Sequence, residues 1–131
     1  MSTLCPVVHF EMPYEDAGRV SKFYRTAFGW EMNPLGSAFN NYILAETTET
    51  RNGRPKRPGH INGGLFPRQP ERPAQSPLIV IGVDDIGVAI AGVEGAGGKV
   101  YGEPHQIPDF GLYVAFEDSE GNPAAMLQPQ M

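Results

Sequence analysis

The second half of the chain repeats the pattern of the first half, at a spacing of 69 residues through the first helix and 71 residues at a later strand. Adding 69 to the residue number carries the helix-capping residue Asp16 onto Asp85 and the helix-ending residue Gly29 onto Gly98. Between cap and glycine, Val20 and Ala27 of the helical stripe fall on alanines 89 and 96, and no gap is needed. A repeat that keeps a cap, a helical stripe and a stop in register indicates one supersecondary unit present twice.

Apolar periodicity predicts the same order of elements in each half. In the first half it predicts a helix at 17–28 and strands at 6–12, 30–32, 41–45 and 61–66. In the second half it predicts a helix from 86 to about 96 and strands at 78–83, 99–102, 112–117 and 124–128. Residues 46–60 lack an apolar pattern and are expected to form a polar loop. The chain is therefore expected to be an α+β domain of two tandem βαβββ modules, at 1–68 and 78–131, joined by a proline-rich linker at 69–77.

Composition limits the classes of protein that this chain can represent. Its 131 residues suit one domain, and its net charge of −5 argues against non-specific nucleic-acid binding. One cysteine excludes an intramolecular disulfide and a four-cysteine zinc site. No apolar run approaches the ~20 residues of a membrane span, and the start of the chain lacks a secretory pattern. We expect a cytoplasmic protein that binds neither nucleic acid nor membranes.

Short motifs recur through nearly the whole chain, at residues 9–16, 23–24 and 28–30, 61–65, 83–86 and 97–99, and 117–122. Together they resemble the motifs of the vicinal oxygen chelate superfamily, which includes glyoxalase I, extradiol dioxygenases and bleomycin-resistance proteins. The fourth-strand segment Ile61–Leu65 resembles the glyoxalase-like members most closely. The resemblance implies a cup-shaped sheet with a shared cavity, often within a homodimer.

The resemblance also implies where a metal ion would be held. Enzymes of the superfamily bind a divalent metal through side chains on the first, fourth, fifth and eighth strands. The matching residues here are His9, Gly64, Leu78 and Ala125, of which only His9 has a metal-binding side chain. A lone imidazole does not supply the several ligands that metal catalysis needs. We therefore expect no cofactor, with a divalent metal held by non-standard ligands as the alternative.

These replacements favour a small-molecule-binding protein over an enzyme. Small and apolar residues at the vacated positions suggest a cavity suited to an organic ligand. The first hypothesis is a bleomycin-resistance-like protein that holds an organic ligand in the cup, as a homodimer. The alternative is a metal-dependent lyase, isomerase or dioxygenase that uses His9. A third possibility is an accessory role in which the dimer surface is itself the function.

Strand alternation places His9 and Glu11 together on one face of the first strand, opposite Phe10 and Met12. Both are candidate catalytic residues. His9 is a general base or a ligand-binding donor in one interpretation and a structural histidine in the other. The Glu11 carboxylate on the same face would raise the pKa of His9. We nevertheless expect Glu11 at the solvated end of the strand.

Four further residues are candidates for ligand binding. Tyr42 and Tyr113 occupy matching positions in the two halves and would offer a ring and a hydroxyl if they face inward. Otherwise they belong to the core or to an interface. His60 and Asn62 flank the fourth strand, where they either reach the mouth of the cavity or serve the loop.

Six of the ten basic residues lie within 22 positions, at 51, 54, 56, 57, 68 and 72. One interpretation is a flap that attracts an anionic ligand into an acidic protein. The interpretation that we favour is a solvated loop whose cations pair with surface carboxylates.

Overall fold

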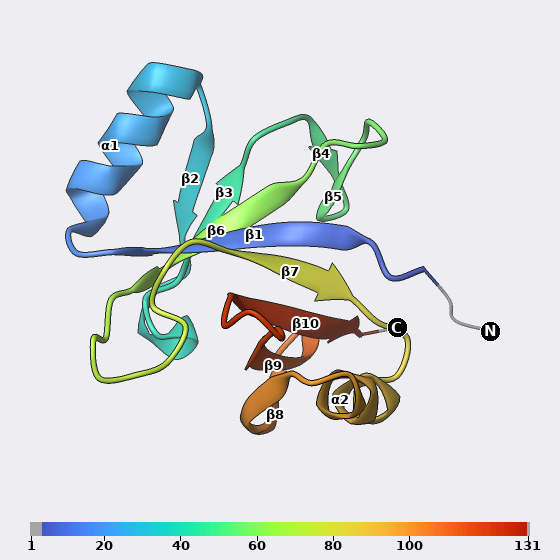
Figure 1. Cartoon of the computed structure of the whole chain (residues 1–131). Helices are drawn as coiled ribbons and strands as arrows, with labels where there is room; N and C mark the ends of the chain where they lie inside the picture. Colours follow the sequence, from blue (N-terminus) through green and yellow to red (C-terminus); the bar gives the residue numbers. More distant parts are fainter. Residues whose placement is uncertain (1–3, 131) are drawn as a thin grey trace. The chain divides into compact units, whose positions relative to one another are not determined.

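The computed structural model describes residues 4–130 of the chain, and its two halves are described in turn (Figure 1). The first half contains one long helix, one short 3-10 helix and six strands. In chain order they are β1 (Val7–Tyr14), α1 (Ala17–Phe28), β2 (Glu31–Pro34), η1 (Ser37–Phe39), β3 (Ile43–Glu46), β4 (Thr50–Arg51), β5 (Arg54–Pro55) and β6 (Asn62–Pro67). The four larger strands lie in the order β2-β3-β6-β1, with β6 parallel to β1 and antiparallel to β3.

The second half has the same topology. Its elements are β7 (Leu78–Gly82), α2 (Ile86–Gly95), β8 (Lys99–Ile107), β9 (Gly111–Glu117) and β10 (Pro123–Pro129). The strands lie in the order β7-β10-β9-β8, and β10 is parallel to β7 and antiparallel to β9. In both halves the last strand therefore lies between the first and third strands. This shared order confirms the two βαβββ modules.

Residues 4–8 belong structurally with the second module. The chain divides into one compact unit at 9–77 and another that joins these residues to those from 78 onward. The backbone N–H of Gly82 donates to the carbonyl of Pro6 at 2.8 Å. A methyl group on Gly82 would lie 3.0 Å from a methyl of Val8. Glycine thus permits the close approach of this segment to β7.

Helices α1 and α2 are each capped by the aspartate that the repeat predicts. The Asp16 carboxylate accepts from the backbone N–H of Arg19 at 2.9 Å, and Asp85 accepts from Val88 at 3.1 Å. Helix α1 ends at Gly29, whose φ of 73° is a left-handed conformation that favours glycine. Neither α1 nor α2, the α-helices of the described residues, is long and apolar enough to cross a membrane.

Each module has its own apolar core. In the first, residues from all four larger strands pack together, namely Tyr14, Met32, Ile43, Ala45 and Leu65, with Tyr24 and Trp30 against them. The two rings of Tyr24 and Trp30 stack with their centroids 4.6 Å apart. In the second, the core comprises Val83, Ile86, Val114, Phe116, Ala124 and Met126. The sheet face that each helix covers is thus the apolar one.

Two segments of the chain differ from the sequence-based expectations. The segment 46–60 is not a patternless loop, because β4 and β5 pair as a two-stranded hairpin. Asn52 and Gly53 form its turn, with positive φ values of 53° and 76° that suit a two-residue hairpin. Strand β8 extends to Ile107 instead of ending at 102, because a register shift between Tyr101 and His105 lets pairing with β9 resume.

Candidate functional site

His9 and Glu11 lie on one face of β1, beside the matching face of β6. In the parallel register His9 pairs with Asn62, and Glu11 pairs with Gly64. Phe10 points to the other face, where it packs against the core of the first module. The predicted alternation along the first strand is therefore confirmed, and it brings the two candidate catalytic residues next to the fourth-strand glycine.

Tyr42 links these two side chains through its hydroxyl group. The hydroxyl donates to Glu11 Oε2 at 2.7 Å and lies 3.1 Å from His9 Nε2. The backbone before Tyr42 is held in place, because the Tyr14 hydroxyl donates to the carbonyl of Asn41 at 2.6 Å. We call His9, Tyr42 and Glu11 the polar triad. The sequence singled out all three residues but did not predict that they bond to one another.

Gly64 makes room for the ring of Tyr42. A Cβ atom at Gly64 would overlap both the hydroxyl and the ring carbon that carries it. Any side chain at this position would therefore displace the Tyr42 hydroxyl from Glu11. The glycine that leaves the fourth strand without a metal ligand is thus the residue that admits the tyrosine.

The expectation that Glu11 lies at the solvated end of its strand is wrong. Glu11 is only 8% exposed, and it is one of two buried polar residues among those described. A buried carboxylate is costly unless hydrogen bonds replace its water. The Tyr42 hydroxyl is such a donor, and it explains how the first strand accommodates an acid among buried groups.

The expectation that Glu11 raises the pKa of His9 is also wrong. Burial lowers the pKa of His9 from 6.5 to about 4, because the charged imidazolium would lose its hydration. At neutral pH the ring is uncharged. It can accept or donate a hydrogen bond, and it does not form an ion pair with Glu11.

His60 and Asn62 hold the loop that carries the β4–β5 hairpin. Asn62 Oδ1 accepts from the backbone N–H of Thr47 at 2.9 Å, and its Nδ2 donates to Thr50 Oγ1 at 2.9 Å. His60 Nδ1 lies 2.8 Å from Thr48 Oγ1 at an exposed position. Both side chains thus bond to residues of the neighbouring loop. These contacts favour a role in holding the loop over a role at the mouth of a cavity.

Two cations of the basic stretch pair with carboxylates. Lys56 pairs with Glu49 at 3.1 Å, and Arg68 pairs with Glu15 at 3.3 Å. These pairs agree with a solvated segment whose cations meet surface carboxylates. Both are exposed pairs, which typically contribute little to stability.

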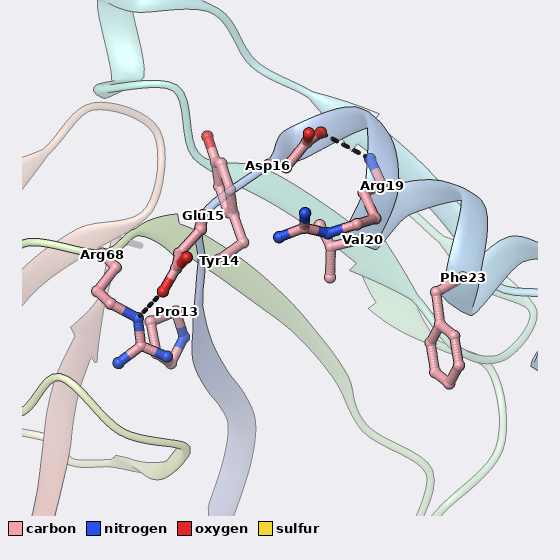
Figure 2. Close-up of a pocket in the computed structure, with 8 residues that line it drawn as sticks. All are labelled: Pro13, Tyr14, Glu15, Asp16, Arg19, Val20, Phe23 and Arg68. Carbon is pink, nitrogen blue, oxygen red and sulfur yellow. Dashed lines mark hydrogen bonds and ion pairs between the residues drawn. The ribbon is translucent and has the colours of Figure 1, made fainter.

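A surface pocket of about 490 Å³ lies at the start of α1 (Figure 2). Figure 2 shows its lining residues, which come from the end of β1, the turn that follows it, the first turns of α1 and the residue after β6: Pro13, Tyr14, Glu15, Asp16, Arg19, Val20, Phe23 and Arg68. None of the predicted site residues lines it. The two acids and two arginines balance in charge, and one pair is already joined. Of its lining residues, the sequence singled out Asp16 as a helix cap and Arg68 as part of the basic stretch, but neither as part of a pocket.

Part of the first module matches a known family model. Residues 7–47 match the model described as bleomycin resistance protein-like N-terminal. A glyoxylase-like domain-containing protein of Didymella fabae is 32% identical over 123 residues, which cover 88% of this chain and 88% of that protein. The chain belongs to the vicinal oxygen chelate superfamily. It is a glyoxalase-like member of it.

Solved structures of the superfamily fold agree with this assignment. The methylmalonyl-CoA epimerase of Streptomyces coelicolor, in complex with 2-nitronate-propionyl-CoA, has a TM-score of 0.69 and 16% identity, covering 98% of this chain and 100% of that one. The Mycobacterium tuberculosis methylmalonyl-CoA epimerase has a TM-score of 0.66 and 12% identity, covering 95% and 88%. At these identities the likeness shows the fold alone.

The superfamily's metal positions in the second module hold hydrocarbon side chains. Leu78 on β7 is 7% exposed and Ala125 on β10 is fully buried. Ala125 lies between Val80 of β7 and Ala115 of β9 in the register of the sheet. Among residues 4–130, no group of three or more His, Cys, Asp or Glu side chains is arranged to hold a metal ion.

The remaining candidate, Tyr113, lies on β9 of the second module. It pairs with His105 of β8 and Leu127 of β10. Its ring contacts that of His105, with the centroids 5.6 Å apart. In the repeat Tyr113 corresponds to Tyr42, and Val80 of β7 corresponds to Glu11, so the second module has no acid at the matching position of its first strand.

Proposed function

We propose that this protein binds a small organic ligand beside His9 without the metal ion that superfamily enzymes use. The observation that carries the proposal is the polar triad. The Tyr42 hydroxyl lies between His9 Nε2 and Glu11 Oε2, over the glycine of the fourth-strand metal position. A metal ion bound at His9 Nε2 would have to displace this hydroxyl.

The chemistry of the four inherited positions supports the same view. His9 is the only one of them with a side chain that can bind a metal ion, because Gly64, Leu78 and Ala125 have no nitrogen, oxygen or sulfur in their side chains. A catalytic metal site needs several protein ligands and an open position for substrate. Glu11 is the nearest additional donor, and one of its oxygens already accepts from Tyr42. The residues at these positions therefore do not fit the family's metal.

Thermal unfolding in the presence of a chelator tests this proposal. Purified protein in EDTA would be screened against neutral and anionic aromatic compounds, because a ligand that binds only the folded state raises Tm. We expect at least one compound to raise Tm in EDTA, and the rise to disappear in His9→Gln. Tyr101→Phe is the matched control, since it removes a tyrosine–glutamate hydrogen bond outside the site.

The opposite outcome supports the alternative function. If no compound raises Tm in EDTA, and one does so only after a divalent metal is added, the proposal is wrong. A metal-dependent lyase, isomerase or dioxygenase that uses His9 with non-standard ligands would then explain the result.

A further inference from the structure

The direction of the hydrogen bonds in the polar triad fixes which nitrogen of His9 carries the proton. Tyr42 donates its single hydroxyl proton to Glu11 Oε2. Toward His9, the tyrosine oxygen can then only accept, so the bond of 3.1 Å requires a proton on Nε2. A neutral imidazole has one N–H, and Nδ1 is therefore left with a lone pair.

This second nitrogen is accessible. Among the described residues, no side-chain nitrogen or oxygen is both fully buried and without a hydrogen-bond partner. The hydrogen bond of the His9 ring in residues 4–130 uses Nε2. Solvent, or a ligand that replaces it, therefore reaches Nδ1. Burial keeps the pKa of the ring at about 4, so the lone pair remains available at neutral pH.

We propose that His9 Nδ1 is a hydrogen-bond acceptor for the bound ligand and selects compounds that bring a hydroxyl or amide donor over carboxylates. The inference rests on the proposed binding function and specifies its ligand class. A ligand carboxylate would place its lone pairs against that of Nδ1, near the Glu11 carboxyl on the same strand face. The site would therefore disfavour the anions that the basic residues at 51–57 would attract.

The tautomer is measured first, by NMR of protein labelled with ¹⁵N histidine. Couplings between the ring nitrogens and ring protons distinguish the two tautomers. We expect His9 to hold its proton on Nε2 throughout the neutral range. In Tyr42→Phe, which lacks the accepting oxygen, we expect a mixture of tautomers, whereas Tyr101→Phe leaves His9 unchanged. A proton on Nδ1 of the unmodified protein would overturn the inference, whatever the protein binds.

The ligand class is measured with three probes of nearly equal size. Benzamide is neutral and has a donor, methyl benzoate is neutral without one, and benzoate is an anion. We expect benzamide to shift the His9 Nδ1 resonance and to bind about fivefold to tenfold more tightly than methyl benzoate, the usual worth of one hydrogen bond. Benzoate is expected to bind most weakly. In His9→Leu the preference for benzamide should disappear.

The outcomes separate this inference from the proposed function. If benzoate shifts His9 as strongly as benzamide, the donor selectivity is wrong while metal-free binding beside His9 stands. If the probes bind without shifting His9, they bind elsewhere, and both the donor selectivity and the proposed site beside His9 are wrong. If the tautomer is as expected but no probe changes any resonance, the proposed selectivity for hydrogen-bond donors is wrong, and the proposed metal-free binding is not supported.

Discussion

The Tyr42 hydroxyl lies so close to Gly64 that a Cβ atom on that residue would overlap it. The two residues come from neighbouring strand segments, since Leu44, two positions after Tyr42, pairs with Gly64 in the antiparallel register of β3 and β6. One glycine therefore determines whether the polar triad can form.

Substituting Gly64 by Ala is expected to destabilise the protein by about 1–3 kcal/mol, the usual cost of overpacking a close contact. The φ of Gly64 lies outside the left-handed region, so the cost arises from Tyr42 and not from backbone strain. In a Tyr42→Ala background most of this cost should vanish. Urea unfolding of the four proteins measures the coupling. An equal cost in both backgrounds would show that the contact is not the cause.

Substituting Tyr42 by Phe keeps the ring over Gly64 and removes the hydroxyl. We expect a loss of about 1.5–3 kcal/mol, because Glu11 is buried and loses a donor to a charged group. Tyr101→Phe breaks a bond of the same length, 2.7 Å, to the less buried Glu117. Its cost should be smaller, below about 1 kcal/mol, since water replaces the hydroxyl. Equal losses would indicate that burial of Glu11 is unimportant.

The lowered pKa of His9 predicts a pH dependence of stability. Between pH 6.5 and 4 the unfolded chain binds a proton at His9 that the folded protein does not, so stability falls as pH falls. Above pH 6.5 the protonation of His9 takes nothing from the free energy of unfolding, whereas by pH 4 it has lowered that free energy by about 3 kcal/mol. Urea unfolding at several pH values should show a weaker slope for His9→Gln than for the exposed control His105→Gln. Parallel slopes for the two variants would contradict the account.

The side chain of Asn62 is expected to fasten the β4–β5 hairpin to the first module. Asn62→Ala removes two hydrogen bonds, to Thr47 and Thr50, and should cost about 1–2 kcal/mol. Amide hydrogen exchange should increase at 47–51. Thr48→Val removes the exposed contact with His60 and serves as the control, with an expected cost below about 0.5 kcal/mol. Unchanged exchange in Asn62→Ala would mean that other contacts hold the hairpin.

The sequence predicted the fold well because its strongest signals are local. Asp16, the stripe that follows it and Gly29 define α1 at the residues where it is observed. The repeat then carried the same topology into the second module. The β4–β5 hairpin was missed although Asn52–Gly53 is a strong turn signal, because its strands are only two residues long.

The arrangement of the site could not be predicted in the same way. Strand alternation placed His9 and Glu11 on one face, but the contact with Tyr42 depends on the register among β1, β6 and β3, which is not encoded in any one segment. Gly64 was interpreted only as a missing ligand, whereas its lack of a side chain admits a specific ring. The burial of Glu11 and the lowered pKa of His9 both follow from this packing.

Metal content tests the central claim most directly. Protein purified without chelator would be analysed for bound Mn, Fe, Ni and Zn, and then titrated with each metal by calorimetry, with His9→Gln as the matched variant. We predict far less than one equivalent of bound metal and no site that depends on His9. One equivalent of a divalent metal, held by the unmodified protein and lost in His9→Gln, would contradict the claim.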